Sequence, residues 1–381
     1  MTSTRLRSLV VLPEPPLVEG GASGRLALAT ARGLDAHGID VHIIAARQSF
    51  AVRGTPPADV AVEVVDVPPE PPGWQSRLER LRRPVGEIAR SDFAERVRHA
   101  ARNADVLHLE EVHTAWCSEG VSTPSLLRLH YFVRWDRDLG VPWKRSFRHA
   151  LEFELAERAA IRRHDRFIAA SPRVASELRR RKPRAEVELV PFCLDPADYP
   201  RAALDGPPVA GLLGTAVWPP TANAIRRLLD EVWPAVRSLV PDARLLLAGR
   251  GTEAFAARAG AGVEVLGEVP SAVAFLNGLS LLLYPVDRGS GVKVKVLESI
   301  ATGVPVVTTP VGAEGIDGSD GIVLGHDTGQ LALAAADLLR DEHERRERGA
   351  AARAHFERLY APRPATEPLA ALYHRIAERG R

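Results

Sequence analysis

Short apolar runs alternate with helical stretches along most of the chain. Arg7 to Leu12 has the pattern of a strand, Ser23 to Ala36 has a helical pattern, and Val41 to Ala45 is strand-like again. Further strand-like runs follow at 62–67, 105–109, 126–130, 166–170 and 187–190, separated by helical stretches at 76–102, 144–163 and 172–181. This alternation predicts an α/β fold with a parallel sheet that has helices on both faces.

A break in the pattern indicates a second domain. The proline-rich segment 191–208 lacks periodicity, and a second strand-helix series runs from Val209 to about Leu324. A chain of 381 residues also exceeds the size at which one core keeps growing. We therefore predict one domain over 1–205 and another over 206–360. We expect the helical end, 361–381, to cross back to the first domain.

Composition narrows the class of protein. A hydrophobic fraction of 45% with 26% charged residues is ordinary for a globular protein, and a net charge of +2 gives no general attraction to nucleic acid. No apolar run is long enough to span a bilayer, and the apolar part of the N-terminus is too short for a secretory signal, so we expect a cytoplasmic protein. Cys117 and Cys193 predict neither a disulfide framework nor a metal site. The basic run Arg179 to Arg184 is typical of the end of a surface helix, but peripheral contact with a membrane stays open.

The most informative stretch is a glycine-rich turn between an apolar run and a helix. Leu281 to Tyr284 reads as a buried strand, and Gly289 and Gly291 allow the backbone to come close to a ligand. The first amides of the following helix would face an anion there. Lys295 and Glu298 lie three residues apart, on neighbouring positions of one helix face. The alternative is that Lys295 and Glu298 form an ordinary solvent-exposed ion pair beside a turn that binds no ligand.

A nucleoside diphosphate would use both side chains. Lys295, with the amides of Ser290, Gly291 and Val292, would neutralise phosphate oxygens, and Lys293 is the reserve cation. Glu298 suits the vicinal hydroxyls of a ribose, because an ionised carboxylate accepts two hydrogen bonds.

The same residues carry a family resemblance. GSGVKVKVLESIATGVPVVTTPVGAEGI, at 289–316, resembles the donor-binding signature of retaining GT-B glycosyltransferases of the family 4 type. GLLGTAVWPPTAN, at 211–223, is similar to the same family, and the likeness runs through 209–325. It implies two facing Rossmann-like, doubly wound parallel-sheet domains and adds Gly214 to the donor-binding residues. One departure concerns Ser290, because the family pattern has a glutamate eight positions before Glu298 to hold the hydroxyls of the donor sugar.

The resemblance implies a reaction class and leaves its partners unspecified. It implies sugar transfer from a nucleotide-diphosphate sugar, with retention of configuration, and without a metal ion or other cofactor. A small molecule, a glycan or a glycolipid would be the acceptor. The nucleobase, the sugar and the oligomeric state stay open. Two alternatives remain, an epimerase or hydrolase of the same fold and a non-catalytic protein that binds nucleotide sugars. A nucleoside triphosphatase is disfavoured because GxxxxGK[ST] is absent.

The first domain offers two candidate contributions to such a site. Gly20 and Gly21 lie in a loop before a helix, where their amides could reach phosphates. The alternative is a plain turn with Ser23 as the helix N-cap. His130 ends a predicted strand at its carboxyl end, where ligands of parallel sheets bind, so we identify it as a catalytic candidate beside Lys295. A structural histidine satisfied by a neighbouring loop is the competing interpretation.

Two other polar clusters in the first domain carry weaker signals. HLEEVH, at 108–113, places its histidines five apart, which does not match a zinc helix, although Glu111 or His113 suits acceptor recognition. The sequence Asp-Arg-Asp at 136–138 spells a metal-binding pattern of other glycosyltransferases. We interpret it as a solvated loop or an acceptor contact.

Overall fold

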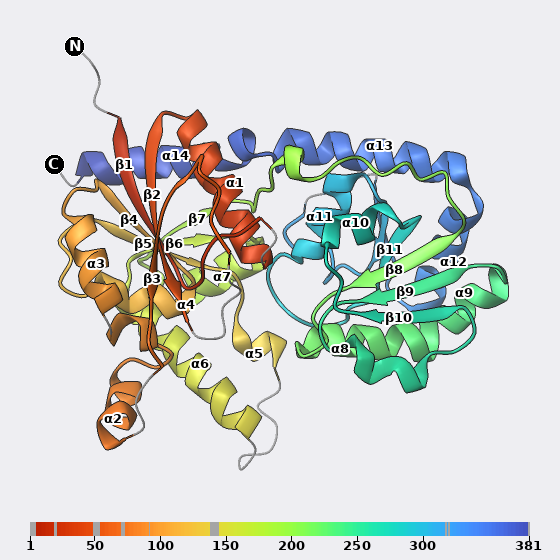
Figure 1. Ribbon diagram of the computed structural model, residues 1–381, viewed down its shortest axis with the longest axis horizontal. Helices are drawn as coiled ribbons and strands as arrows, with labels where there is room; N and C mark the ends of the chain where they lie inside the picture. Colours follow the sequence, from red (N-terminus) through yellow and green to blue (C-terminus); the bar gives the residue numbers. More distant parts are fainter. Residues whose placement is uncertain are drawn as a thin grey trace. The chain divides into compact units, whose positions relative to one another are not determined.

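The chain folds into two compact units, shown in the computed structural model (Figure 1). The structure describes residues 5–18, 21–48, 54–69, 73–90, 92–137, 145–316, 318 and 321–379. Unit 1 comprises Met1–Arg134, Asp138–Cys193 and Ala361–Arg381, and unit 2 comprises Trp135–Arg137 and Leu194–Tyr360. Among the described helices, none is both long and apolar enough to cross a bilayer.

Unit 1 is built on a parallel sheet whose described strands have the order β3-β2-β1-β4-β5-β6-β7. The strands are β1 (Leu6–Leu12), β2 (Ile39–Arg47), β3 (Ala61–Asp66), β4 (Val106–Glu110), β5 (Ser125–Leu129), β6 (Arg166–Ala169) and β7 (Glu186–Leu189). The order reverses its direction at β1, so the neighbouring β1 and β4 form a switch point. Ligands of such sheets bind outside the carboxyl ends of the strands at this point.

Helices cover both faces of this sheet. They are α1 (Ala22–Ala36), α2 (Trp74–Arg82), α3 (Asp92–Ala101), α4 (Glu111–Thr114), α6 (Arg145–Arg163), α7 (Pro172–Arg181) and α14 (Pro362–Arg379), with α5 (Val133–Asp136) at the boundary between the units. Because parallel crossovers are right-handed, α1 lies on one face and α3, α6 and α7 lie on the other.

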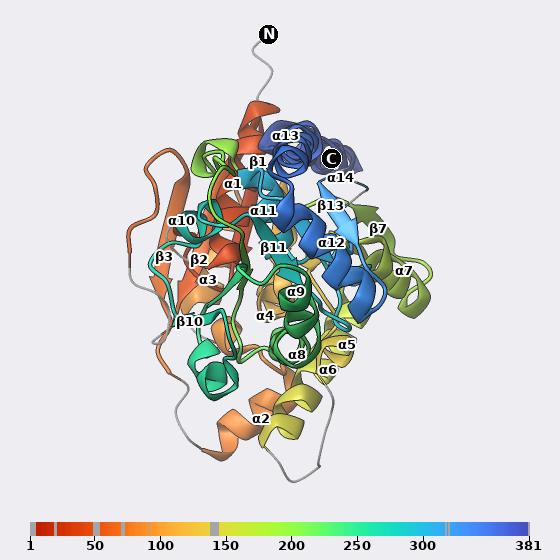
Figure 2. The same cartoon turned by 90° about the vertical axis from the view of Figure 1, so that its right-hand side faces the viewer.

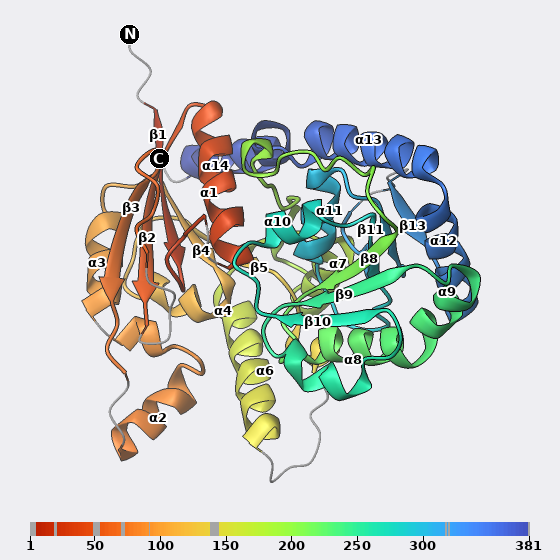
Figure 3. The same ribbon diagram turned by 45° about the vertical axis from the view of Figure 1, so that its right-hand side comes forward.

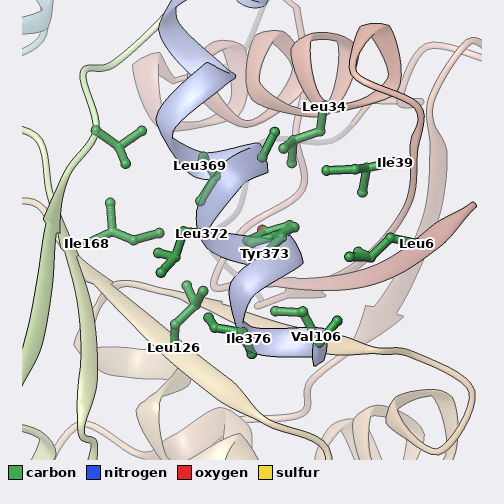
Figure 4. Close-up of a cluster of buried hydrophobic side chains, with 13 residues drawn as sticks. Leu6, Leu34, Ile39, Val106, Leu126, Ile168, Leu369, Leu372, Tyr373 and Ile376 are labelled. Carbon is green, nitrogen blue, oxygen red and sulfur yellow. The ribbon is translucent and has the colours of Figure 1, made fainter. Parts of the chain in front are cut away.

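The C-terminal helix α14 belongs to unit 1 and packs against α1. Figure 4 shows its apolar side chains, among them Leu372 and Tyr373, directed at strand residues that include Leu126 and Ile168. Gly33 of α1 permits this packing, because a Cβ there would lie within 3.0 Å of backbone and side-chain atoms of α14. The last segment of the sequence therefore completes the core of the first sheet.

The expected helix over 76–102 is wrong as a single element. The structure has α2, a 3-10 turn at Glu87–Arg90 and then α3. Pro84 cannot continue the hydrogen-bond ladder of α2, and Val85 adopts a positive φ of 47°. A Pro-Val-Gly sequence inside a charged, helix-like stretch is thus enough to divide it.

Unit 2 is also built on a parallel sheet, with the described strand order β10-β9-β8-β11-β12-β13 (Figure 3). The strands are β8 (Val209–Leu213), β9 (Arg244–Ala248), β10 (Val263–Gly267), β11 (Leu281–Tyr284), β12 (Val306–Thr308) and β13 (Ile322–Leu324). The two sheets confirm the predicted doubly wound α/β class. In this unit the order reverses at β8, whose neighbour β11 leads into the glycine-rich turn.

The helices of unit 2 form two layers. They are α8 (Pro219–Arg227), α9 (Trp233–Leu239), α10 (Ala272–Asn277), α11 (Val294–Thr302), α12 (Thr328–Arg340) and α13 (Glu342–Leu359). α12 packs on α9 and on β8, β11 and β12, and Figure 2 shows α9 and α12 side by side. α11 packs on α10 and α13. It ends at Gly303, whose φ of +77° suits the left-handed C-cap conformation.

Candidate functional site

The glycine turn, defined here as Asp287–Gly291, connects β11 to α11 at the carboxyl edge of the second sheet. α11 begins at Val294 with Lys293 as its N-cap, which is later than the sequence suggested. The amides of Ser290 and Gly291 therefore belong to the turn and not to the first turn of the helix. Gly289 and Gly291 have φ values of +124° and +71°, which lie in the region that favours glycine. Successive turn amides of this kind can form an anion-binding concavity.

Carboxylates already accept hydrogen bonds from these amides. The Ser290 amide donates to Oδ1 of Asp136 at 2.8 Å, and the Ser290 hydroxyl donates to the same oxygen at 2.7 Å. The Gly291 amide donates to Oε1 of Glu314 at 3.0 Å. These carboxylate oxygens stand in for the oxyanion of a ligand. The turn thus has the geometry to bind anionic oxygens.

The position of Asp136 corrects the prediction of a solvated loop. Its side chain is 4% exposed and lies against the glycine turn. Burial raises the pKa of Asp136 to about 6, although its hydrogen bonds from Ser290 and the charge of Lys293 act in the opposite direction. Asp138, the second acid of the Asp-Arg-Asp sequence, lies outside the described residues.

Lys295 is half-buried, and its ammonium lies between a threonine hydroxyl and a tyrosine ring. Its Nζ donates to Oγ1 of Thr221 at 3.1 Å and lies 4.4 Å from the ring centroid of Tyr284. Gly214, at the end of β8, makes room for it, because a Cβ at that position would come within 3.0 Å of Nζ. Burial lowers the pKa of Lys295 to about 8, and the charge of Glu298 offsets part of this effect. The ammonium is poorly solvated and would gain from an anionic ligand.

Lys293 connects the turn to this ammonium electrostatically. Its Nζ donates to the carbonyl oxygen of Gly291 at 2.6 Å. Burial lowers its pKa, the charges of Glu314 and Asp136 act to raise it, and Lys295 lowers it further. The charge of Lys293 therefore interacts with those of Lys295, Asp136 and Glu314. Val292, the remaining predicted residue of this segment, lies between the turn and the N-cap.

Glu298 lies one helical turn beyond Lys295 and is 3% exposed. The hydroxyl of Tyr199 donates to its Oε1 at 3.0 Å. Tyr199 follows the short 3-10 turn Pro196–Asp198 and is fully buried, so the segment between the predicted domains contributes to this site. No sequence motif pointed to Tyr199.

In unit 1, His130 follows β5 and lines a pocket with residues from β1, α1 and β4. Its Nε2 lies 2.8 Å from Oε2 of Glu110, and its Nδ1 lies 3.5 Å from Oε1 of Glu111. Burial acts to lower the pKa of His130, but the hydrogen bond to Glu110 and the charges of both glutamates outweigh it, so the pKa is raised. The surroundings favour the imidazolium.

Glu110 is the centre of a buried polar cluster that sequence reasoning did not assign. Arg128 lies 3.5 Å from its Oε1, and His108 lies 3.2 Å from the same oxygen. Burial acts to raise the pKa of Glu110, but Arg128 and the two histidines hold it well below its usual range. His108 also shares a 2.6 Å hydrogen bond with the hydroxyl of Tyr373 on α14. The available signal was the place of Glu110 at the carboxyl end of a predicted strand, where ligands of parallel sheets bind.

The glycine loop of the first domain is only partly described. Gly20 lies outside the described residues, and Gly21 is the N-cap of α1. No side chain caps this helix, so the alternative interpretation of Ser23 as its N-cap is wrong. Ser23 instead lines the His130 pocket. The strained backbone of Glu111, with φ of +65°, lies in the same pocket.

Comparisons with known families cover most of both units. Residues 207–341 match the family described as glycosyl transferases group 1. Residues 21–193 match the glycosyl transferase 4-like domain. No curated protein matches the chain in sequence.

Solved structures with the same fold match nearly the whole chain. Sucrose-phosphate synthase from Thermosynechococcus elongatus is 15% identical with a TM-score of 0.69, covering 98% of this chain and 100% of its own. HepE from Anabaena, in complex with UDP and glucose, is 15% identical with a TM-score of 0.65, covering 97% and 99%. TarM is 9% identical with a TM-score of 0.70, covering 98% and 99%. The chain thus shares its fold with these structures over nearly its full length.

Proposed function

The chain belongs to the GT-B glycosyltransferases of the family 4 type, and we propose that Lys295 is the group with which it drives a nucleoside diphosphate away from the donor sugar. The observation that carries this proposal is the poorly solvated ammonium, held by Thr221 and Tyr284 in the space that Gly214 leaves. A fixed positive charge that needs no reorganisation is an effective stabiliser of a departing anion.

The reaction moves charge onto the diphosphate. The bond between the anomeric carbon and a phosphate oxygen breaks, and its electron pair stays on that oxygen. The acceptor hydroxyl oxygen bonds to the anomeric carbon, and its proton passes to the departing diphosphate. The raised pKa of His130 favours its protonated form, so we assign it hydrogen-bond donation and not the role of the base. It donates a hydrogen bond to the sugar or to the acceptor.

Asp136 and Glu314, which accept hydrogen bonds from amides of the glycine turn, take different roles. Asp136 is held by both the amide and the hydroxyl of Ser290 and is buried, so it stays in place and presents an acceptor for a sugar hydroxyl. Glu314 is only half-buried and occupies the amide of Gly291. It moves away when a phosphate oxygen takes this amide. Glu298 then anchors the ribose beside Tyr199.

These two roles predict opposite effects on donor binding. Glu314→Gln removes a competing charge from the phosphate position, so the KM for the donor falls. Asp136→Asn removes an acceptor for the sugar, so kcat/KM falls by about tenfold or more, the scale of one hydrogen bond to a charged group. Steady-state kinetics against the donor measure both. A decrease in KM for Asp136→Asn would instead make it a competitor of the donor.

We also propose that transfer retains the anomeric configuration and needs no divalent metal. The resemblance over 289–316 supports the first, and the cationic role of Lys295 supports the second. NMR of the product reports its anomeric configuration. Full activity after dialysis against EDTA is the expected result, and a loss restored by Mg²⁺ or Mn²⁺ would refute metal independence.

A donor panel tests the proposed function. Thermal shift with UDP-, GDP- and dTDP-sugars identifies the nucleotide, and UDP-glucose is the first choice because HepE, a neighbour in fold, was solved with it. Transfer is then measured with pools of sugar, glycan and glycolipid acceptors. Lys295→Ala should lower turnover at least about a hundredfold, the scale of losing one preorganised donor. Unchanged turnover in this variant would refute the assignment.

Incubation with donor alone separates the alternatives. A transferase releases little nucleoside diphosphate without an acceptor, whereas a hydrolase releases it at the full rate and an epimerase alters the sugar. A protein that binds the donor yet turns over nothing with any acceptor pool would be a non-catalytic binder.

A further inference from the structure

Helix α2 exposes three large apolar side chains on one of its faces. Trp74, Leu78 and Leu81 are 72%, 49% and 79% exposed. Their i, i+4 and i+7 spacing places them along a single stripe of the helix. Figure 1 shows α2 projecting from the sheet of unit 1, which leaves this stripe outside the core. Large apolar side chains exposed together mark a contact surface more often than single exposed leucines do.

An arginine hollow adjoins the C-terminal end of α2. Among the residues that the structure describes, its basic lining consists of Arg82 of α2 with Arg162, Arg163 and Arg166, and its one lining carboxylate is Asp165. Lys182 neutralises Asp165 at 2.6 Å. Around the hollow, Arg163 lies 3.5 Å from Glu119, Arg166 lies 3.6 Å from Glu186, and Arg82 lies 3.6 Å from Glu79. The arginines still outnumber the carboxylates in the lining, so the hollow attracts anions.

The remaining titratable group of the hollow adds no positive charge. His164 shares a hydrogen bond at 2.9 Å with the backbone carbonyl of Ala115, and burial lowers its pKa to about 4. It is therefore neutral near pH 7. The attraction of the hollow for anions comes from its arginines.

We propose that α2 and the arginine hollow dock unit 1 onto the surface of an anionic phospholipid membrane. The apolar stripe enters the boundary between headgroups and acyl chains, where tryptophan is favoured, and the arginines bind lipid phosphates. Charge complementarity selects the anionic lipid surface over a neutral one. The helix lies on the membrane and does not cross it.

This surface is separate from the His130 pocket. The hollow includes Ser125, the first residue of β5, whereas His130 follows the last residue of the same strand. Five residues of strand place the two sites roughly 17 Å apart. A membrane bound at the hollow leaves the pocket accessible, and the docking does not depend on the proposed reaction.

Flotation of the full-length protein with vesicles tests the proposal. Vesicles of phosphatidylglycerol and phosphatidylcholine in equal parts should carry the protein upward, and pure phosphatidylcholine should not. Rising salt should release it. Trp74→Ser combined with Leu81→Ser should lower the bound fraction more than tenfold. Arg82→Gln combined with Arg162→Gln should lower affinity by about fivefold for each arginine removed.

The matched control is Leu333→Ser, which removes a 56% exposed leucine from α12 of unit 2. It should bind vesicles like the original protein. All variants should retain the thermal unfolding midpoint, because the changed side chains lie at the surface.

Three results would overturn the proposal: no flotation of the original protein, equal flotation of the α2 variant, or a concentration-dependent dimer that the α2 variant loses. Stabilisation by inorganic phosphate through the arginines without flotation would also overturn it.

Discussion

Gly214→Ala offers a way to displace the Lys295 ammonium without removing it. The new methyl group would lie within 3.0 Å of Nζ, 3.1 Å from Cε and 3.0 Å from Cγ2 of Thr221. Real Cβ atoms essentially never approach other heavy atoms within 3.0 Å, so something must move. Gly214 has no positive φ, so alanine fits its backbone. The flexible end of the lysine moves first, and it leaves the hydroxyl of Thr221.

The expected loss follows from the role of the ammonium. If Lys295 stabilises the departing diphosphate, its displacement should lower kcat about a hundredfold, or about 2.7 kcal/mol of transition-state stabilisation. Stability should change by less than about 1 kcal/mol, because the obstructing atom belongs to a side-chain terminus and not to the backbone. The variant therefore separates catalysis from folding.

Steady-state sugar transfer and chemical denaturation measure the two effects. The matched control is Gly260→Ala, where a Cβ would meet no heavy atom within 4 Å. A double variant of Gly214→Ala with Lys295→Ala completes a cycle. If the methyl group acts through the lysine, it should have no further effect once the lysine is absent.

Two results would refute this reasoning. Full activity of Gly214→Ala would show that the position of the ammonium is not critical. A loss that persists undiminished in the Lys295→Ala background would show that the methyl group obstructs the donor directly.

Three further predictions concern charge and packing. In the original protein kcat/KM should fall above pH about 8, because Lys295 loses its charge there. Lys295→Arg should remove this fall, because arginine keeps its charge. A fall that remains in the variant would mean that another group causes it. Glu110→Gln should lower the pKa of His130 in NMR titration, because the raising hydrogen bond and charge are lost; an unchanged value would place the cause elsewhere. Gly33→Ala should destabilise the protein to denaturant by about 1–3 kcal/mol, because its Cβ would meet the Pro362 carbonyl of α14; equal stability would indicate looser packing.

Local patterns predicted most of the architecture. Apolar runs such as Leu281 to Tyr284 predict buried parallel strands because both faces of such a strand are covered. The turn after this run carries its own glycines, so its approximate place could be read directly. The exact start of α11 could not, because Gly289 and Gly291 leave the turn several backbone paths and tertiary contacts choose among them.

Residue pairs that are distant in the sequence but adjacent in the fold could not be predicted from sequence patterns. Glu110 and His130 are 20 residues apart and meet because β4 and β5 are neighbours in the sheet. Tyr199 reaches Glu298 from 99 residues away. No spacing rule within a helix or strand reports such pairs. They depend on strand order and on the path of the connecting segments, which tertiary packing determines.

Ser290 illustrates how a local departure can mislead. The resemblance expects a glutamate there, and a serine cannot supply a carboxylate. The structure brings the Asp136 carboxylate onto the Ser290 hydroxyl and amide from 154 residues away. A glutamate at 290 would have to share this space with Asp136, and two like charges in a buried site would repel each other. The Ser290 hydroxyl and the Asp136 carboxylate therefore form a pair in which each residue suits the other. A search for the sugar specificity of this enzyme should vary both residues together.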